Sequence, residues 1–244
     1  MNEKGMTARD WDRLADSWDE HIMSSLHEDT SGNIAALLRA VAQSHRRILD
    51  YGCGVGGYLP LLSAQFAEVT AADTSAACVA QARRAALSLP NVGVTTIRKL
   101  PRTGDYDAVL LANVLLHPGE AARARILERV CAQLRRGGTL VLVVPAVESV
   151  HLSEAVRRAY TRKRKSAYTP APPGRAFEPG IIGINGNPTK HYSADELPLV
   201  LQRHGLELTR LERARYSWLS EAFEGLDRRL EQRPWDWVAA AVRR

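Results

Sequence analysis

Several features are scarce or absent in this sequence of 244 residues, and each absence excludes a class of protein. Only three cysteines occur, Cys53, Cys78 and Cys131, and none is part of a C-x-x-C pair, so we expect neither a disulfide framework nor a metal site. No apolar run approaches the ~20 residues of a transmembrane helix. The first ten residues are charged and lack an apolar segment, which predicts no signal peptide. Together these absences favour a cytoplasmic protein.

The net charge of +6 is concentrated in one segment. Residues 151–175 contain one acidic residue, Glu154, and seven basic residues, so this segment carries the whole formal excess of positive charge. The basic residues are Arg157, Arg158, Arg162, Lys163, Arg164, Lys165 and Arg175. A uniformly basic chain would indicate a nucleic-acid partner, whereas one basic patch on a neutral body indicates a more local role. On a helix, Arg158, Arg162 and Lys165 would share one face, which either is solvated or meets an acidic ligand.

The most informative segment runs from Ile48 to Gly57. Its apolar residues end at Asp50, and glycines then recur at every second position, as in a buried strand that turns sharply beneath a ligand. Gly52, Gly54 and Gly57 also fit the G-x-G-x-x-G pattern of dinucleotide-binding domains. A pyrophosphate, however, is disfavoured by an acid two residues before the first glycine, and the natural partner of Asp50 is a cation.

Three further segments follow in order. Residues 69–75 form an apolar run that reaches Asp73, 21 residues after Gly52, where an acid commonly holds a ribose diol. Residues 106–113 form a second apolar run, which ends at Asn113, and residues 134–144 form a third. In this order and at this spacing, the four segments make the chain resemble the class I S-adenosylmethionine (SAM) dependent methyltransferases over residues 11–242, nearly its whole length.

This resemblance implies an α/β fold, namely a doubly wound, mostly parallel seven-stranded sheet of the Rossmann-like methyltransferase type, closed by an antiparallel hairpin. The pattern of apolar residues agrees with alternating strands and helices. Helices are expected at residues 11–22, 32–42, 76–87 and 120–134 and from Ser193 towards His204, where Ser193 to Glu196 form a capping box. Strands are expected at residues 47–51, 68–72, 93–97, 107–112, 139–144, 206–213 and 235–242.

A single domain is expected to span residues 1–244. Residues 1–45 would form N-terminal cap helices, and residues 46–145 the SAM-binding core. Residues 146–192 would form a lid insertion after the fifth strand that covers the acceptor, and residues 193–244 a C-terminal helix with the closing strands. The lid is inferred from five prolines and a glycine-rich run in a connection too long to be an ordinary loop.

The resemblance also implies how SAM is held. Asp50 would face the α-ammonium of the methionine moiety, Asp73 would bind the ribose hydroxyls, and Asn113 would lie near the sulfonium. Asp73 has an alternative role as a cap of the following helix, Asn113 as a turn residue and Trp18 as a core side chain. The predicted cofactor-binding residues are Trp18, Asp50, Gly52, Gly54, Gly56, Asp73, Thr74, Leu100 and Asn113.

The chain departs from the family after its third expected strand. Many relatives carry an acid there that accepts a hydrogen bond from the adenine amino group, whereas this sequence reads Thr96-Ile97-Arg98-Lys99-Leu100. Adenine would then be held by backbone groups and by contacts with Thr74 and Leu100.

Methyl transfer chiefly requires donor and acceptor to be aligned in a dry site, although an alcohol or carbon acceptor also benefits from a general base. The candidates for this base are His117, after the fourth strand, Glu148 and His151, after the fifth, and His191, at the end of the lid. The alternative for each histidine is a structural role.

Three functions stay open at this stage. The first is methylation of an oxygen, nitrogen or carbon atom of a small molecule, which would be acidic if the basic segment faces it, in biosynthesis or secondary metabolism. The second is methylation of RNA, a peptide terminus or a carrier-bound substrate docked by residues 157–165. The third is a SAM-binding scaffold without activity, which intact Asp50, Asp73 and glycines disfavour.

Overall fold

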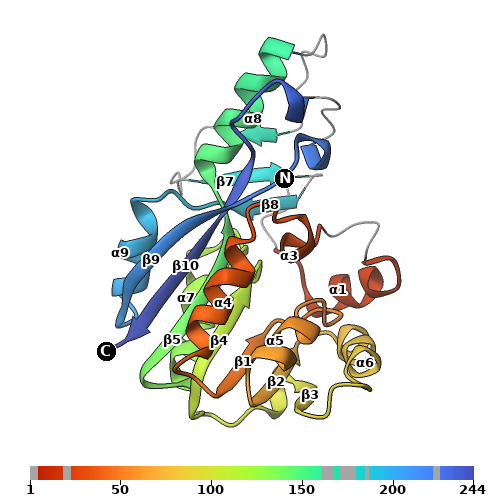
Figure 1. The fold of residues 1–244 in the computed structure, drawn as a ribbon, viewed down its shortest axis with the longest axis vertical. Coiled ribbons are helices and arrows are strands. Elements are labelled where there is room, and N and C mark those ends of the chain that lie inside the picture. Colours follow the sequence, from red (N-terminus) through yellow and green to blue (C-terminus); the bar gives the residue numbers. More distant parts are fainter. Residues whose placement is uncertain (1–4, 19–22, 161–167, 171–179, 185–186, 222–225) are drawn as a thin grey trace.

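A computed structural model describes residues 5–18, 23–160, 168–170, 180–184, 187–221 and 226–244 of the chain. Its centre is a seven-stranded sheet with the strand order β3-β2-β1-β4-β5-β10-β9 (Figure 1). Strands β1 to β5 are parallel, and β10 pairs antiparallel with both β5 and β9. The strands are β1 (Arg47–Tyr51), β2 (Glu68–Asp73), β3 (Val92–Thr96), β4 (Tyr106–Ala112), β5 (Leu134–Pro145), β9 (Leu206–Arg215) and β10 (Trp235–Arg243). The predicted fold class and closing hairpin are therefore confirmed.

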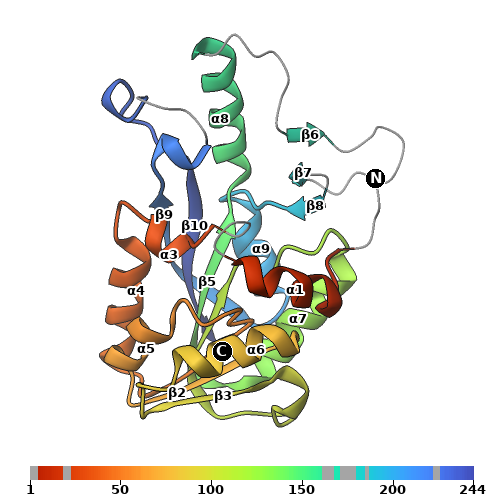
Figure 2. The ribbon, with the colours of Figure 1, turned by 90° about the vertical axis from the view of Figure 1, so that its right-hand side faces the viewer.

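Helices cover both faces of this sheet (Figure 2). One face packs against α4 (Asn33–Ala42), α5 (Leu59–Gln65) and α6 (Ala76–Ala85), and the other against α7 (Glu120–Gln133) and α9 (Glu196–Gln202). Because side chains alternate across a strand, Ile48 and Leu110 enter the first layer, whereas Leu49 and Leu111 enter the second. The inner strands are buried on both faces, which is why they read as continuous apolar runs in the sequence.

The first helix starts earlier than the helix expected at residues 11–22. Helix α1 spans Ala8–Leu14, and its first turn is held by Asp10, whose carboxylate accepts from the backbone N–H of Thr7 at 2.8 Å. The chain then tightens into the 3₁₀ turn η1 (Ala15–Ser17). Gln81 donates from Nε2 to the Ala15 carbonyl at 2.6 Å, which ties this turn to α6. Residues 19–22 lie outside the described part.

The expected lid region contains regular structure beyond the carboxyl ends of the parallel strands (Figures 1 and 2). Helix α8 (Val147–Tyr160) follows β5 directly, and β6 (Tyr168–Pro170), β7 (Ile181–Ile184) and β8 (Asn187–Lys190) form a small antiparallel sheet. Val156 of α8 packs against Trp218 and Leu226, from the turns η3 (Trp218–Glu221) and η4 (Leu226–Arg228). Whether this region covers the acceptor stays a prediction.

The predicted basic face is described only in part. Arg162 and Lys165 lie outside the described residues, so the face that they were expected to share with Arg158 is not tested. Arg157 is buried, and its Nε donates to Glu154 at 3.0 Å, while the exposed Arg158 bonds the same carboxylate at 2.9 Å. Two of the basic side chains are thus already engaged within the helix.

Two more elements complete the fold, the short helix α3 (Ser25–Glu28) and the turn η2 (Ile97–Lys99). Strand β5 begins at Leu134, earlier than the expected residue 139, because Leu134 already pairs with Tyr106 before an irregularity in the register. None of the helices in the described ranges combines the length and apolarity that crossing a bilayer would need.

Candidate cofactor site and active site

The glycine-rich turn after β1 has the backbone geometry that the sequence indicated. Gly52, Gly54 and Gly56 all have positive φ, at 82°, 53° and 95°. A Cβ atom on Gly54 would lie 2.7 Å from the ring of Trp18, and one on Gly52 would lie 2.4 Å from a methyl group of Val114. Both the left-handed backbone and the close packing therefore require glycine here.

Two buried oxygen atoms at the ends of adjacent strands have no hydrogen-bond partner among the described residues. One is Oδ2 of Asp50, at the end of β1, and the other is Oδ1 of Asn113, just after β4. Strands β1 and β4 are paired, with Asp50 opposite Leu110, so both oxygens lie at the same edge of the sheet. Buried acceptors without partners are costly, and a cationic ligand that donates hydrogen bonds would satisfy them.

The Asp50 carboxyl group titrates far from its ordinary range. Burial raises its pKa to about 7, and the nearby Asp73 carboxylate adds to the rise. Without a ligand, the protein thus holds a carboxyl group that is half-protonated near neutral pH. A bound cation would favour its ionised form.

Asp73 ties the glycine turn to the end of β2. Its Oδ2 accepts from the backbone N–H of Gly54 at 2.9 Å, and its Oδ1 accepts from that of Ser75 at 2.8 Å. Burial raises the pKa of Asp73, and these hydrogen bonds oppose the rise. The cap of α6 is Ser75, whose Oγ accepts from the Cys78 N–H at 3.0 Å. Asp73 is therefore not needed as the cap, and its proposed contact with ribose stays a prediction.

The N-terminal segment, residues 5–18, forms a roof over this turn. Trp18 packs on Gly54 and against Trp11, with ring centroids 5.9 Å apart. Asp12 accepts from the Ser75 hydroxyl at 2.6 Å and from the Ala77 N–H at 3.1 Å, so α1 caps the start of α6. Nothing local in the sequence marks Asp12 for this role, because the helix that it caps is distant in the chain.

The two residues expected at the adenine end have different environments. Thr74 is exposed just after β2, whereas Leu100 is buried in the core beneath α7. The segment after β3 forms η2, and the acid that many relatives carry there is absent, as the sequence shows. Both residues stay predicted contacts of adenine.

Two of the three candidate histidines, His117 and His191, differ in which ring nitrogen is available. Nδ1 of His117 accepts from the Gly119 N–H at 2.9 Å, so the neutral ring carries its proton on Nε2 and presents a donor. Nδ1 of His191 lies 3.1 Å from the Thr189 carbonyl, which can only accept, so its neutral ring keeps Nε2 as a free base. Burial lowers the pKa of His191 to about 4, so this ring is neutral at physiological pH.

The other two candidates for the base fit that role less well. Glu148 accepts from the Ala194 N–H at 2.9 Å and from the Trp237 indole at 3.3 Å, so each carboxylate oxygen joins α8 to a distant segment. His151 is exposed on α8. Geometry thus favours His191 over Glu148 and His151 as a base.

A buried cationic cluster, which the sequence analysis missed, fixes the loop that carries His117. Arg123 donates to the carbonyls of His117 and Pro118 at 2.5 and 2.7 Å. Lys190, which is fully buried and ion-paired with Glu196 at 2.6 Å, donates its backbone N–H to Leu116. The hydroxyl of Tyr192 donates to Leu115 at 2.9 Å. The carbonyls of four consecutive loop residues, Leu115 to Pro118, therefore accept hydrogen bonds. The donors lie on α7 and in the segment before α9.

Comparison with known proteins gives a match in the same region. Residues 48–138 match the family model described as "Methyltransferase domain". No curated protein matches the sequence.

Solved structures of several methyltransferases have a similar fold. The 1,6-didemethyltoxoflavin-N1-methyltransferase of Burkholderia thailandensis, with bound 1,6-didemethyltoxoflavin and S-adenosylhomocysteine (SAH), has a TM-score of 0.64 and 15% identity over 97% of this chain and 86% of that one. A DhpI–SAH complex has a TM-score of 0.61 and 21% identity, covering 96% and 93% of the two chains. The magnesium protoporphyrin IX methyltransferase of Synechocystis PCC 6803, with bound SAM, has a TM-score of 0.55 and 17% identity, covering 89% and 80%. At these identities the likeness shows the fold.

Proposed function

Because the chain carries a class I SAM-dependent methyltransferase domain, we propose that it transfers the methyl group of SAM to an oxygen or nitrogen atom of a small molecule, in a biosynthetic or secondary-metabolic reaction. A carbon acceptor is the alternative. Three of the similar structures, named above, are methyltransferases or complexes with SAH, and two of these methyltransferases are named for a small molecule.

The residues at the carboxyl ends of β1, β2 and β4 fit the cofactor. Asp50, with an unpartnered buried oxygen, would accept from the α-ammonium of the methionine moiety, and Asn113 would turn its unpartnered amide oxygen towards the same cationic end. Asp73 would exchange hydrogen bonds with the ribose hydroxyls. When bound, SAM supplies an activated methyl group on a cationic sulfur.

The observation that favours a small acceptor is the roof formed by residues 5–18. Trp18 lies on Gly54, and the N-terminal end of the segment reaches His117, since a Cβ on Gly5 would lie 2.3 Å from its ring. The N-terminal segment thus covers the glycine turn and His117, which leaves less room for a macromolecule than for a small molecule. A covered site also excludes water, which strengthens the electrostatic interactions inside it.

Within this site we assign different tasks to the two histidines. His191, neutral and with Nε2 free, would accept a proton from a hydroxyl or amine acceptor. His117, whose Nε2 carries the proton, would donate a hydrogen bond that orients the acceptor. Arg123 and Lys190 would act as positioning residues, because they fix the loop that holds His117.

A macromolecular acceptor, the second candidate, would need the basic segment 157–165 as a docking surface. Arg157 and Arg158 instead share the carboxylate of Glu154, and Arg157 is buried. This part of the segment is engaged within the chain, which weakens the docking hypothesis.

The proposal is tested by incubating the protein with methyl-labelled SAM and a fractionated cell extract. We expect label in compounds that pass a dialysis membrane, and loss of that label with Asp50→Ala. The His191→Ala variant should retain SAH binding but lose about 10²-fold or more in kcat, the usual contribution of a general base. Label recovered only in RNA or protein would refute a small acceptor, and unchanged kcat in His191→Ala would refute the assigned base.

A further inference from the structure

The buried Asp236 of β10 lies at the same edge of the sheet as the predicted cofactor site. It pairs with Pro145, the last residue of β5, and β5 adjoins β4, which ends just before Asn113. Along this edge the order is therefore Asp50 on β1, Asn113 after β4, Pro145 on β5 and Asp236 on β10. Two strand spacings of about 4.8 Å put Asn113 and Asp236 roughly 10 Å apart along the edge. None of the residues assigned above to SAM or to proton transfer lies on β10.

The Asp236 side chain points to the face of the sheet that packs on α4. Its neighbours Trp235 and Trp237 pack in the layer beneath α7 and α9, and side chains alternate along a strand. Tyr216, just after β9, packs in the other layer and donates its hydroxyl hydrogen to Oδ2 of Asp236 at 2.8 Å. Arg213 lies over both tryptophan rings, 4.3 Å from the centre of Trp235. The phenol of Tyr216, and not the cation of Arg213, thus faces this carboxylate.

A second pair of hydroxyl groups belongs to the same region. Ser25 of α3 and Tyr58, just before α5, share a hydrogen bond of 2.7 Å. The backbone N–H of Thr30 donates to the Arg215 carbonyl at 2.8 Å, which fixes the segment after α3 beside Tyr216. Tyr58 also packs against the apolar cluster that contains Tyr216.

The electrostatic potential around these hydroxyl groups is negative. Burial raises the pKa of Tyr58, and the carboxylates of Asp50 and Asp236 add to the rise. Burial also raises the pKa of Tyr216, again with a contribution from Asp236. A ligand group that carries positive charge and donates hydrogen bonds is favoured here, whereas an anion is disfavoured.

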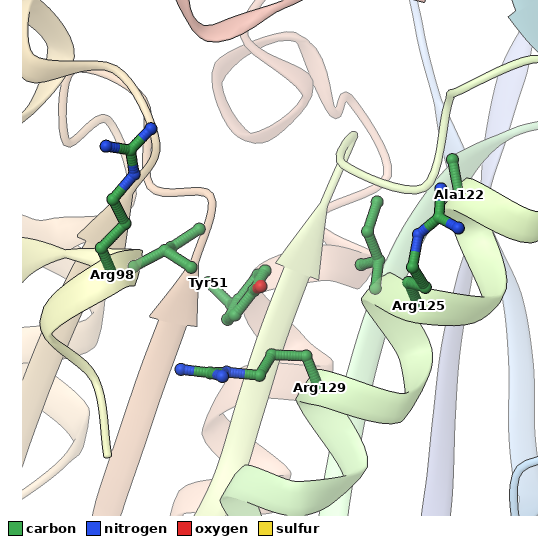
Figure 3. Close-up of a pocket in the computed structure, with 7 residues that line it drawn as sticks. Tyr51, Arg98, Ala122, Arg125 and Arg129 are labelled. Carbon is green, nitrogen blue, oxygen red and sulfur yellow. The ribbon is translucent and has the colours of Figure 1, made fainter. Parts of the chain in front are cut away.

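Basic side chains beside the cofactor site are differently placed. Arg98, Arg125 and Arg129 line a hollow between η2 and α7, next to the segment assigned to adenine (Figure 3). Lys190, in the segment that fixes the His117 loop, is fully buried and ion-paired with Glu196 at 2.6 Å. The adenine end is thus lined by cations, whereas the edge beyond Asn113 carries the carboxylate of β10.

We propose that Asp236 binds an amino group of the acceptor, at a distance from the atom that is methylated. The inference rests on the proposed function, which places the methyl donor near Asn113. The acceptor would lie between Asn113 and Asp236, with its amino group hydrogen-bonded to the carboxylate and its nucleophilic atom turned towards SAM. Tyr216 would act as a positioning residue, because its hydroxyl orients that carboxylate. A charge-assisted hydrogen bond of this kind selects an amine over an alcohol or an acid of similar shape.

Tyramine is a suitable probe, because its phenol and its amine lie at opposite ends of one small molecule. Tyrosol and para-hydroxyphenylacetate carry an alcohol or a carboxylate in place of the amine. Calorimetry on protein saturated with SAH should show that tyramine binds, that tyrosol binds about tenfold more weakly, and that para-hydroxyphenylacetate binds most weakly. Asp236→Asn keeps the shape of the side chain and removes its charge, so it should weaken tyramine about tenfold and leave tyrosol unchanged.

Two further variants separate recognition from a merely structural role. Tyr216→Phe removes the hydroxyl that orients Asp236, so the preference for tyramine over tyrosol should fall about threefold. The matched control is Asp105→Asn, which removes an exposed carboxylate before β4, at the opposite edge of the sheet. It should bind tyramine as the unmodified protein does. All three variants should bind SAH normally, which also shows that they fold.

The proposal is overturned if tyramine binds no more tightly than tyrosol, including when neither binds. It is also overturned if Asp236→Asn weakens both probes equally, or if Asp105→Asn weakens tyramine as much as Asp236→Asn does. Should Asp236→Asn fail to bind SAH, Tyr216→Phe decides, because an unchanged preference for tyramine then overturns the proposal. Failure of the unmodified protein to bind SAH would contradict the proposed function, whereas SAH binding without a preference for tyramine contradicts only this inference.

Discussion

Lowering the pH from 7 to 5 is expected to weaken SAH binding by about 50-fold, because Asp50 must be ionised to pair with the ligand's ammonium. The free protein holds this carboxyl group with a pKa of about 7, raised by burial and by Asp73. If the ammonium returns the pKa to its ordinary value, at pH 7 about half of the free molecules are already ionised. At pH 5 only about one free molecule in a hundred has an ionised Asp50, so part of the binding free energy must be used to ionise this group.

The ratio of these two populations gives the 50-fold change, which corresponds to about 2.3 kcal/mol. The direction of the change in affinity follows from the raised pKa of Asp50. The free protein binds an extra proton below pH 7, and binding of the ligand releases it. Affinity therefore falls as the pH falls, and it gains only about twofold above pH 7.

Calorimetric titration of SAH at pH 5, 6, 7 and 8 measures this dependence directly. Repeating the pH 5 titration in two buffers with different ionisation enthalpies should show close to one proton released per SAH bound. The control is Asp50→Asn, which cannot titrate and should bind weakly but with an affinity independent of pH. Equal affinity of the unmodified protein at pH 5 and pH 7, or the same pH dependence in Asp50→Asn, would refute the pairing of Asp50 with the ammonium.

Three further predictions concern single residues. Gly54→Ala should abolish measurable SAH binding, because it strains a φ of 53° and collides with Trp18, while Gly57→Ala, which meets nothing within 4 Å, should bind normally in the same calorimetry; equal behaviour would contradict the turn geometry. Asp73→Ala should weaken SAH binding by about 1–3 kcal/mol, the cost of leaving polar groups unpaired, and an unchanged dissociation constant would exclude contact with ribose. Because the pKa of His191 falls from 6.5 to about 4 on folding, the unfolded chain takes up the proton first as the pH drops. The free energy of unfolding should thus fall between pH 7 and pH 4 by about 3 kcal/mol more than in His191→Asn, as measured by urea denaturation; parallel pH profiles would show that His191 is not buried as a neutral ring.

The strands of the sheet were predictable from the sequence, because the relevant signals are local. Buried strands such as Ile48 to Asp50 are continuous apolar runs, and the glycines mark a turn whose backbone other residues cannot adopt. The mostly parallel sheet and its final antiparallel hairpin agree with what the resemblance implied.

Contacts between distant segments were not predictable in this way. Asp12 caps α6 across more than sixty residues, and Lys190 reaches the loop at Leu116 from a distant part of the sequence. The free nitrogen of each histidine depends on one backbone partner, so His117 and His191 look alike in the sequence but differ in the fold.

The roof formed by residues 5–18 has a consequence for the order of events in turnover. With Trp18 against Gly54, spent cofactor can leave only after this segment retreats or together with it. That retreat also removes Asp12 from the start of α6, and losing a helix cap of this kind costs about 1 kcal/mol. The Asp12 carboxylate would therefore stabilise the closed form while the reactants are bound. Opening that form would cost only about twice the thermal energy. Exchange of the donor, rather than transfer of its methyl group, would then be the step that the N-terminal residues control.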